Sequence, residues 1–439
     1  MVRPGLAQLV YDDGGSHTLT GDSDSVTVQI LNGSSLTLDG SFRESFFTLE
    51  DTAEITVNAV VANSLELNNI PIVAKGNSFV TINDGTELNG WRSSGIELQD
   101  ASQLLLGGGM VRGDAGLAGI VAGGSSTATM TGGEVRADFG DAFSSGPAVL
   151  LRDHATFVVS AGKLMSLDLG VVTYDDSRFE ANGGIIDVHD LTPTAGIQSF
   201  HQSRVVLNDL TMSVESPQTS IPMFDANEES TIVVNHGAFT YLGFGAKTSL
   251  NSAMRTQGDA SLEINGGAFQ IQNFVDPPTR NAAPFNVFAA SETSDLLVSG
   301  GTYDIRLDIT DAQDLSLPPK LFLAQDGGTI EIRGGQFAVE VKEAGVSAPD
   351  GSVRELEAQS SSVITLYGSN FNYPLGSIND LEGTLTGQLL DGSAISWSFL
   401  RAPSANIILV PEPSTFALSL VSALLLISGD RGRRRSCKA

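Results

Sequence analysis

Short segments in which apolar and polar positions alternate dominate the chain, and a ten-residue version returns along most of its length. The clearest copies are residues 260–269, 294–303 and 328–337. In each copy the third and fifth positions are apolar, whereas the second and fourth are mostly polar or small. This period of two predicts a short β-strand with one buried face. The seventh and eighth positions are often Gly-Gly, which permits a sharp corner after the strand.

The spacing between copies predicts the fold. The copies begin at Ser78, Ser102, Ser126, Ala155, Ser177, Ser203, Ser230, Ala260, Ser294, Gly328 and Ser362, so successive starts are 22 to 34 residues apart. Periods of about 20–50 residues indicate a solenoid or a propeller, but a propeller blade needs about 40–45 residues and leucine-rich repeats need a consensus that these units lack. We therefore predict an all-β chain folded as a single-stranded parallel β-helix (β-solenoid), with about a dozen coils about 4.8 Å apart.

Stacking would bring equivalent positions of successive copies together, which predicts two ladders. The sixth position is asparagine in four consecutive copies: Asn182, Asn208, Asn235 and Asn265. Amides on neighbouring coils can form a hydrogen-bonded ladder at a corner. The tenth position is aromatic in five consecutive copies, and these rings are expected to stack: Phe239, Phe269, Tyr303, Phe337 and Phe371. Turn preference and ordinary core packing are the alternative interpretations of the two rows.

The pattern divides the chain into three parts. Residues 1–372 are predicted to form the β-helix, and its last long copies carry Pro-bearing insertions at similar offsets: Asp276–Pro278, Leu317–Pro319 and Ala348–Asp350. These insertions are expected side by side on one face, either as tolerated surface loops or as a binding surface. Residues 373–409 are predicted to form a β-hairpin cap around an Asp391-Gly392 turn. Residues 410–439 form a separate tail.

The charge is strongly acidic outside the tail. The formal net charge of the chain is −27, and residues 1–409 hold 19 basic and 49 acidic side chains. Nucleic-acid binding requires a basic footprint, so we predict no nucleic-acid partner for the body. We favour a solvated extracellular surface that resists non-specific association over diffuse cation binding as the interpretation of this acidity.

The tail has three parts in a fixed order. The motif Pro411-Glu412-Pro413 is followed by a 14-residue apolar run, Phe416–Gly429, and then by three arginines, Arg433, Arg434 and Arg435. The run is shorter than the ~20 residues of an ordinary membrane span. We expect a short hydrophobic C-terminal helix that crosses with help from its flanks, with the arginines as a stop on the cytoplasmic side.

This tail resembles the PEP-CTERM sorting signal of exported bacterial proteins, on residues Pro411 to Pro413, the apolar run and the arginine cluster. The repeat body also looks like that of β-helical, autotransporter-like members of this group. The resemblance implies Sec export, transient anchoring in the inner membrane, and cleavage near the motif by an exosortase, a membrane protease with a cysteine nucleophile. The mature form would lie on the cell surface or outside the cell. Because no 7–15-residue apolar leader opens the chain, we expect the true start and a signal peptide upstream.

Catalysis is the main alternative. Many polysaccharide lyases and hydrolases are β-helices, which is an argument by fold analogy alone. Such enzymes need a carboxylate pair, or carboxylates with a basic residue. Asp12-Asp13 and Asp175-Asp176 are the candidates, but each lies next to a tyrosine in a Gly/Ser context that is also ordinary turn chemistry. We therefore predict no catalytic residue.

The histidines give no metal motif. His17, His154, His189, His201 and His236 show no HxH or HExxH spacing, and His236 occupies a corner position of its repeat. We predict no cofactor and no transition metal. Calcium binding at scattered Asp and Asn corners is left open, because the sequence does not indicate which residues would bind it.

The sequence thus favours an exported structural or adhesive protein of the cell surface or extracellular matrix. Its expected partners are an exosortase, the inner membrane during transit and, as an open question, an extracellular polysaccharide. Two alternatives remain: a polysaccharide lyase or glycoside hydrolase, and a passive glycan-binding surface module.

Overall fold

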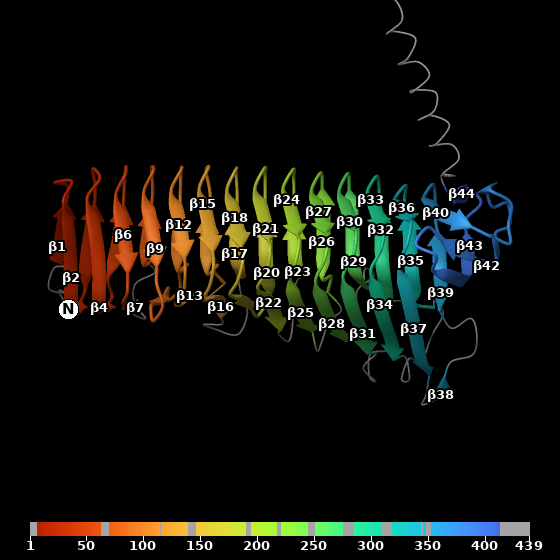
Figure 1. Ribbon diagram of the computed structural model, residues 1–439, viewed down its shortest axis with the longest axis horizontal. Coiled ribbons are helices and arrows are strands. Elements are labelled where there is room, and N and C mark those ends of the chain that lie inside the picture. The colour runs from red at the N-terminus through yellow and green to blue at the C-terminus, as the bar shows by residue number, and fades with distance from the viewer. Residues whose placement is uncertain are drawn as a thin grey trace, which may run out of the picture.

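The protein is a rod of stacked coils. The computed structural model describes residues 7–62, 70–114, 116–138, 146–189, 195–216, 221–244, 251–274, 285–308, 318–343, 346–347 and 353–412. These residues form 44 strands, with no helix among them, and successive coils lie side by side from one end of the rod to the other (Figure 1). Almost all strand pairs are parallel. The predicted all-β solenoid is confirmed.

The strands form three columns that run along the rod, each built from strands that pair with their equivalents in the coils before and after. The first column contains β1 (Ala7–Tyr11), β3 (Val26–Ile30), β5 (Phe46–Leu49), β8 (Ile72–Ala74), β11 (Ile96–Leu98), β14 (Ile120–Ala122), β17 (Pro147–Leu151), β20 (Leu169–Thr173), β23 (Ala195–Ser199), β26 (Phe224–Glu228), β29 (Asn251–Gly258), β32 (Phe285–Ser291), β35 (Lys320–Gln325), β39 (Arg354–Ala358) and β43 (Ala394–Arg401).

The second column holds the repeat identified in the sequence. It contains β2 (Ser16–Asp24), β4 (Ser35–Arg43), β6 (Glu54–Val57), β9 (Phe79–Ile82), β12 (Gln103–Leu106), β15 (Thr127–Met130), β18 (Thr156–Val159), β21 (Arg178–Ala181), β24 (Arg204–Leu207), β27 (Thr231–Val234), β30 (Ser261–Ile264), β33 (Asp295–Val298), β36 (Thr329–Ile332), β40 (Val363–Ser369) and β44 (Asn406–Pro411).

The third column begins where β7 pairs with the second half of the long strand β4. It contains β7 (Val60–Ala62), β10 (Glu87–Asn89), β13 (Met110–Asp114), β16 (Glu134–Asp138), β19 (Lys163–Ser166), β22 (Ile185–His189), β25 (Thr211–Ser216), β28 (Ala238–Phe244), β31 (Ala268–Phe274), β34 (Thr302–Asp308) and β37 (Gln336–Glu343). Outside the three columns lie β38 (Val346–Ser347), β41 (Gly376–Ser377) and β42 (Glu382–Leu389).

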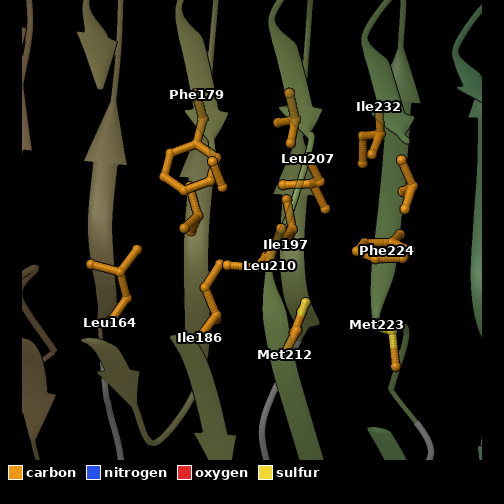
Figure 2. Close-up of a cluster of buried hydrophobic side chains, with 14 of the residues drawn as sticks. Leu164, Phe179, Ile186, Ile197, Leu207, Leu210, Met212, Met223, Phe224 and Ile232 are labelled. Carbon is orange, nitrogen blue, oxygen red and sulfur yellow. The ribbon is translucent and has the colours of Figure 1, made fainter. Parts of the chain in front are cut away.

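One continuous apolar core runs inside the columns. In the second column the third and fifth repeat positions point inward, as Val205 and Leu207 do with no exposed surface. The first repeat position is also buried, and it is small because it lies at the inner corner: Ser102, Ser203 and Ser294 are fully buried. Figure 2 draws part of this core, where side chains from all three columns meet, among them Ile197, Phe224, Phe179, Leu207, Ile186 and Met212.

Most of the variation in coil length falls at one corner. Every internal gap in the described residues falls between a third-column strand and the next first-column strand. The segments with the predicted insertions, 275–284, 309–317 and 348–352, are among them. Their placement at equivalent points of successive coils follows from the strand order, whereas their predicted contacts lie outside the described residues.

The predicted hairpin closes the C-terminal end of the rod. Strands β42 and β43 pair antiparallel, and the Gly392 N–H donates to the carbonyl of Leu389 in the Asp391-Gly392 turn at 2.9 Å. Strand β43 also pairs parallel with β39, and β44 with β40. The segment predicted as a cap therefore also supplies the last strands of the first two columns. Of the tail, the described residues include Pro411 and Glu412, and the rest (Pro413, the apolar run and Arg433 to Arg435) lies outside them.

The four asparagines form a continuous ladder. Each Nδ2 donates to the Oδ1 of the asparagine one coil earlier: Asn208 to Asn182 at 2.7 Å, Asn235 to Asn208 at 2.8 Å, and Asn265 to Asn235 at 3.0 Å. A separate pair, Asn83 to Asn58 at 2.8 Å, repeats the arrangement nearer the N-terminus. Because the coils stack, asparagines at the same corner of successive coils hydrogen-bond to one another through their side-chain amides.

The aromatic row stacks through four rings and then changes. Ring centroids are 4.7 Å apart for Phe239–Phe269, 4.8 Å for Phe269–Tyr303 and 4.6 Å for Tyr303–Phe337. Phe371 does not continue the row. It follows the end of β40 and lies beside Gly387 of β42, because the chain turns into the cap before a further third-column strand. Trp397 of β43 instead contacts Phe337 edge-on, with centroids 5.5 Å apart.

Candidate functional surfaces

A row of turn residues links the first column to the second. The residue two places before each repeat start has a positive φ, between 53° and 75°. The row comprises Gly76, Asp100, Gly124, Asp153, Asp175, His201, Glu228, Gly258, Glu292, Asp326 and Ser360. We call it the corner row. Glycine adopts such φ values at no cost, and Asp and Asn tolerate them better than most residues.

Side chains of the corner row satisfy backbone N–H groups on the preceding coil. The N–H of Gly124 donates to Asp153 Oδ2 at 2.8 Å, and that of Asp153 to Asp175 Oδ2 at 3.1 Å. The N–H of Asp175 donates to His201 Nδ1 at 3.2 Å, and that of His201 to Glu228 Oε2 at 3.0 Å. Asp153, Asp175 and Glu228 therefore have a structural task at this corner. Sequence analysis missed the row, although its signal is present in the residue two places before each repeat start.

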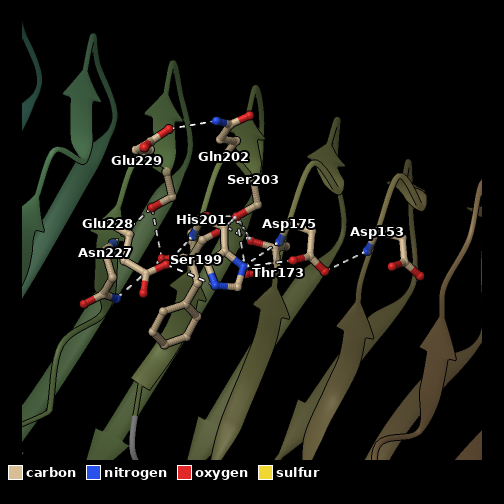
Figure 3. Close-up of polar contacts among 12 residues, drawn as sticks. Asp153, Thr173, Asp175, Ser199, His201, Gln202, Ser203, Asn227, Glu228 and Glu229 are labelled. Atoms are coloured by element: carbon tan, nitrogen blue, oxygen red, sulfur yellow. Dashed lines mark hydrogen bonds and ion pairs between the residues drawn. The ribbon is translucent and has the colours of Figure 1, made fainter.

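His201 lies between two carboxylates of this row (Figure 3). Its Nδ1 is 3.0 Å from Asp175 Oδ1 and its Nε2 is 3.2 Å from Glu228 Oε2. The ring is about half exposed and lies beside a stacked pair, Tyr174 and Phe200, whose centroids are 4.9 Å apart. The arrangement spans three successive coils and braces them at the surface.

The two Asp-Asp pairs considered for catalysis lie in different coils and make turn contacts. Asp13 accepts the N–H of Gly15 and a hydrogen bond from His17 Nε2, both at 2.8 Å. These bonds, that of His17 foremost, lower the pKa of Asp13. Asp175 belongs to the corner row, and Asp176 Oδ2 lies 3.3 Å from His154 Nδ1.

The remaining histidines lie at separate places. His189 Nδ1 is 3.4 Å from Asp187 Oδ1 on the outer face of β22. His236 is exposed at the turn between β27 and β28, at the corner where its repeat position places it. Within the described residues, no group of three or more His, Cys, Asp or Glu side chains is arranged to hold a metal ion.

A shallow hollow of ≈ 350 Å³ lies on the outer face of the third column, over β31, β34 and β37. Its polar side chains are Gln270, Thr302, Asp304 and Gln336, and Ala268 and Ala338 leave room between them. Small side chains on neighbouring strands thus open a groove that crosses the strands and runs along the rod. The three strands that line it are those that precede the insertion segments.

Buried ion pairs lie on the first column, which the alternating pattern did not indicate. Asp225 is fully buried and accepts two hydrogen bonds from Arg255, at 2.8 and 2.7 Å. Further along, Lys320 Nζ is 3.1 Å from Glu357 Oε1, and both side chains are 4% exposed. Arg354 donates to the second oxygen of Glu357 at 2.7 Å. A buried charge is tolerated only when it is paired in this way.

The Pro-Glu-Pro motif begins on the last strand of the rod. Pro411 ends β44, and the N–H of Glu412 donates to the carbonyl of Gly368 at 3.1 Å. Glu412 Oε1 accepts a hydrogen bond from Ser369 Oγ at 3.2 Å. Both Pro411 and Glu412 are exposed. Within the described part of the chain there is no helix of the length and apolarity that a membrane crossing requires, and residues 416–429 lie outside that part.

Comparisons with known proteins return no relative: no family model, no curated protein and no solved structure matches the chain.

Proposed function

We propose that the chain is an exported structural or adhesive protein of the cell surface or extracellular matrix. In this proposal the C-terminal tail holds the precursor in the inner membrane, and an exosortase releases the rod by cleavage near Pro411 to Pro413. The observation that carries the proposal is the order of the tail: motif, apolar run and arginine cluster, directly after the last strand.

The position of the motif supports a detachable tail. Cleavage directly after Glu412 would leave every described strand in place, because β44 ends at Pro411. The folded body would therefore keep its columns and its cap once the anchor is removed. An elongated rod with a strong net negative charge suits an exposed location, because like charges keep such surfaces apart.

The test follows processing and location together. The full chain, with an export signal placed upstream, is produced in cells with and without an exosortase. We expect a shortened, released form only in cells with the enzyme. Replacing Pro411, Glu412 and Pro413 together by alanine should leave the full-length chain in the membrane fraction. Pro403→Ala, in the turn before β44, is the matched control and should be processed normally. Unchanged processing without the exosortase would contradict the proposal.

A second candidate, passive glycan binding, is favoured by the hollow over β31, β34 and β37. Amide, hydroxyl and carboxylate groups there can hydrogen-bond the hydroxyls of a sugar chain laid across the strands. Replacing Gln270 and Gln336 together by alanine should then weaken retention on immobilised extracellular polysaccharide. Thr240→Ala, on the outer face of the neighbouring strand β28, should not. Equal retention of all three proteins would argue against this role.

A further inference from the structure

Three side chains on the first column bring together the groups needed to form an amide bond. Asn286 of β32 and Lys320 of β35 are direct register partners on adjacent parallel strands. Glu357 lies one coil further, on β39, with Oε1 3.1 Å from Lys320 Nζ. The strand of Lys320 therefore lies between a strand that carries an amide and a strand that carries a carboxylate.

All three side chains are withdrawn from water. Asn286 is 4% exposed, as are the side chains of Lys320 and Glu357. The Oδ1 atom of Asn286 is buried and has no hydrogen-bond partner within the described part of the chain. An unsatisfied buried carbonyl is costly and rare. The amide carbon of Asn286 is thus in dry surroundings, next to the strand that supplies an amine.

We propose that Lys320 and Asn286 form an intramolecular isopeptide bond, with Glu357 transferring protons. The Lys320 ammonium gives a proton to the Glu357 carboxylate across their contact, and the neutral amine attacks Cγ of Asn286. The new Nζ–Cγ bond forms as the Cγ–Nδ2 bond breaks. Glu357 returns its proton to the departing nitrogen, and the resulting ammonia takes up the second proton that Nζ loses on becoming an amide. Asn286 and the Lys320 ammonium together yield a secondary amide and one ammonium ion. No oxidant or reductant is involved.

The site supplies the groups that each step needs. Burial would raise the pKa of Glu357, but hydrogen bonds from Arg354 and Gln359 and the charge of Lys320 hold it below its ordinary value, so Glu357 is an ionised carboxylate in contact with the Lys320 ammonium. A desolvated lysine amine is a competent nucleophile. Holding amine and amide on adjacent strands makes the reaction intramolecular, which replaces a bimolecular encounter. Exclusion of water also protects the product from hydrolysis.

The surroundings of Glu357 hold it in position for this task. Arg354 Nη1 donates to Oε2 at 2.7 Å, and Gln359 Nε2 donates to Oε1, the oxygen that contacts Lys320. The other buried pair on this column, Asp225–Arg255, cannot react in the same way, because a guanidinium is not deprotonated in proteins. The proposed bond would link two neighbouring coils covalently near the C-terminal end of the rod.

Peptide mapping of the purified full chain tests the proposal. Trypsin cuts after Arg280, Arg306, Lys320 and Arg333, so the unbonded chain gives separate peptides 281–306, 307–320 and 321–333. The bonded chain gives instead one branched species, 281–306 joined to an uncut 307–333, lighter by one ammonia. Free peptides alone from the folded wild-type protein would overturn the proposal.

Two variants assign the roles. Lys320→Arg keeps a positive charge beside Glu357 but supplies no nucleophile, so its map should show only separate peptides. Glu357→Gln should lose most of the branched species, and an undiminished yield would overturn the proton-transfer role. Circular dichroism that matches the wild type shows that each variant is folded. If a variant does not fold, the wild-type map alone decides whether the bond exists.

Discussion

At the scale of single residues, the corner row shows how one backbone conformation selects several residue types. The position needs a positive φ and a side chain that can accept a hydrogen bond from the previous coil. Asp, Glu and His meet the second need, and Gly meets only the first. The row therefore contains both kinds of residue, and its acidity arises from hydrogen bonding along the rod.

Asp153 separates these two needs experimentally. Its φ is 57°, and its carboxylate accepts the N–H of Gly124. Asp153→Gly loses the hydrogen bond but fits the backbone, whereas Asp153→Ala loses the bond and also strains the turn. We expect the alanine variant to be less stable than the glycine variant by about 1 kcal/mol. Thermal unfolding of both variants measures the difference. Equal stabilities would show that the positive φ at this position does not strain an alanine.

The ionisation of Asp295 should make the stability of the fold depend on pH in a known direction. Partial burial raises the pKa of its carboxyl, a hydrogen bond from Thr329 opposes this, and the charge of Glu331 adds to the rise. Because the folded-state pKa is raised, the contribution of Asp295 to stability is fully present below the unfolded value and is lost as pH rises through the folded value. Ionised Asp295 is therefore unfavourable at neutral pH.

Asp295→Asn should accordingly raise the unfolding temperature at pH 7, and this gain should disappear below about pH 4, where the wild-type carboxyl is protonated. Asp304→Asn is the control with the opposite sign at neutral pH, because Asp304 pairs with Arg306 at 3.1 Å. Unfolding curves across this pH range measure both effects. A gain that persists in acid would contradict the assignment.

At the scale of elements, each strand is held mainly by its equivalents in the neighbouring coils. The second-column strands are only four residues long through most of the rod, too short to be stable alone. Register along the rod is fixed because like side chains meet like, as in Phe239, Phe269 and Tyr303 of the third column. A slip of one residue would turn the buried face outward.

Phe269 tests the stacking contribution. It stacks on Phe239 and on Tyr303, with centroids 4.7 and 4.8 Å away. Phe269→Leu keeps an apolar side chain but removes both contacts, which should cost about 1–3 kcal/mol. Phe157→Leu is the matched control, because its neighbour Phe179 lies farther away, at 6.2 Å, and the loss should be smaller. Thermal unfolding of both variants makes the comparison. Equal losses of stability would mean that the ring stacking adds nothing to the burial of apolar area.

At the scale of the whole molecule, the rod is a one-dimensional stack closed at its C-terminal end by the β42–β43 hairpin. Coils contact mainly their neighbours, so stability is a sum of local terms. The ring of Trp397 is 5.7 Å from that of Phe322 and 5.5 Å from that of Phe337, measured between centroids. It joins the last aromatic rings of two columns to the hairpin.

Removing this contact should loosen one end of the rod only. Trp397→Ala should cost about 3–5 kcal/mol at the C-terminal coils. Hydrogen exchange should become faster in β36, β37 and β40 and stay unchanged in β12 and β15, many coils away. Uniform acceleration along the rod would show that the solenoid unfolds as a single cooperative unit.

The sequence by itself determined the period, the buried positions and the asparagine row, because a solenoid repeats one local environment and so repeats its residue choices. It also contains the three-part tail on which the proposed function depends. Only the tertiary structure decided that Trp397, and not Phe371, contacts the last stacked ring, because the chain leaves the repeat before Phe371. Likewise, only the structure placed Asn286, Lys320 and Glu357 together. These residues lie on three successive first-column strands, whose pairing across coils no local pattern encodes.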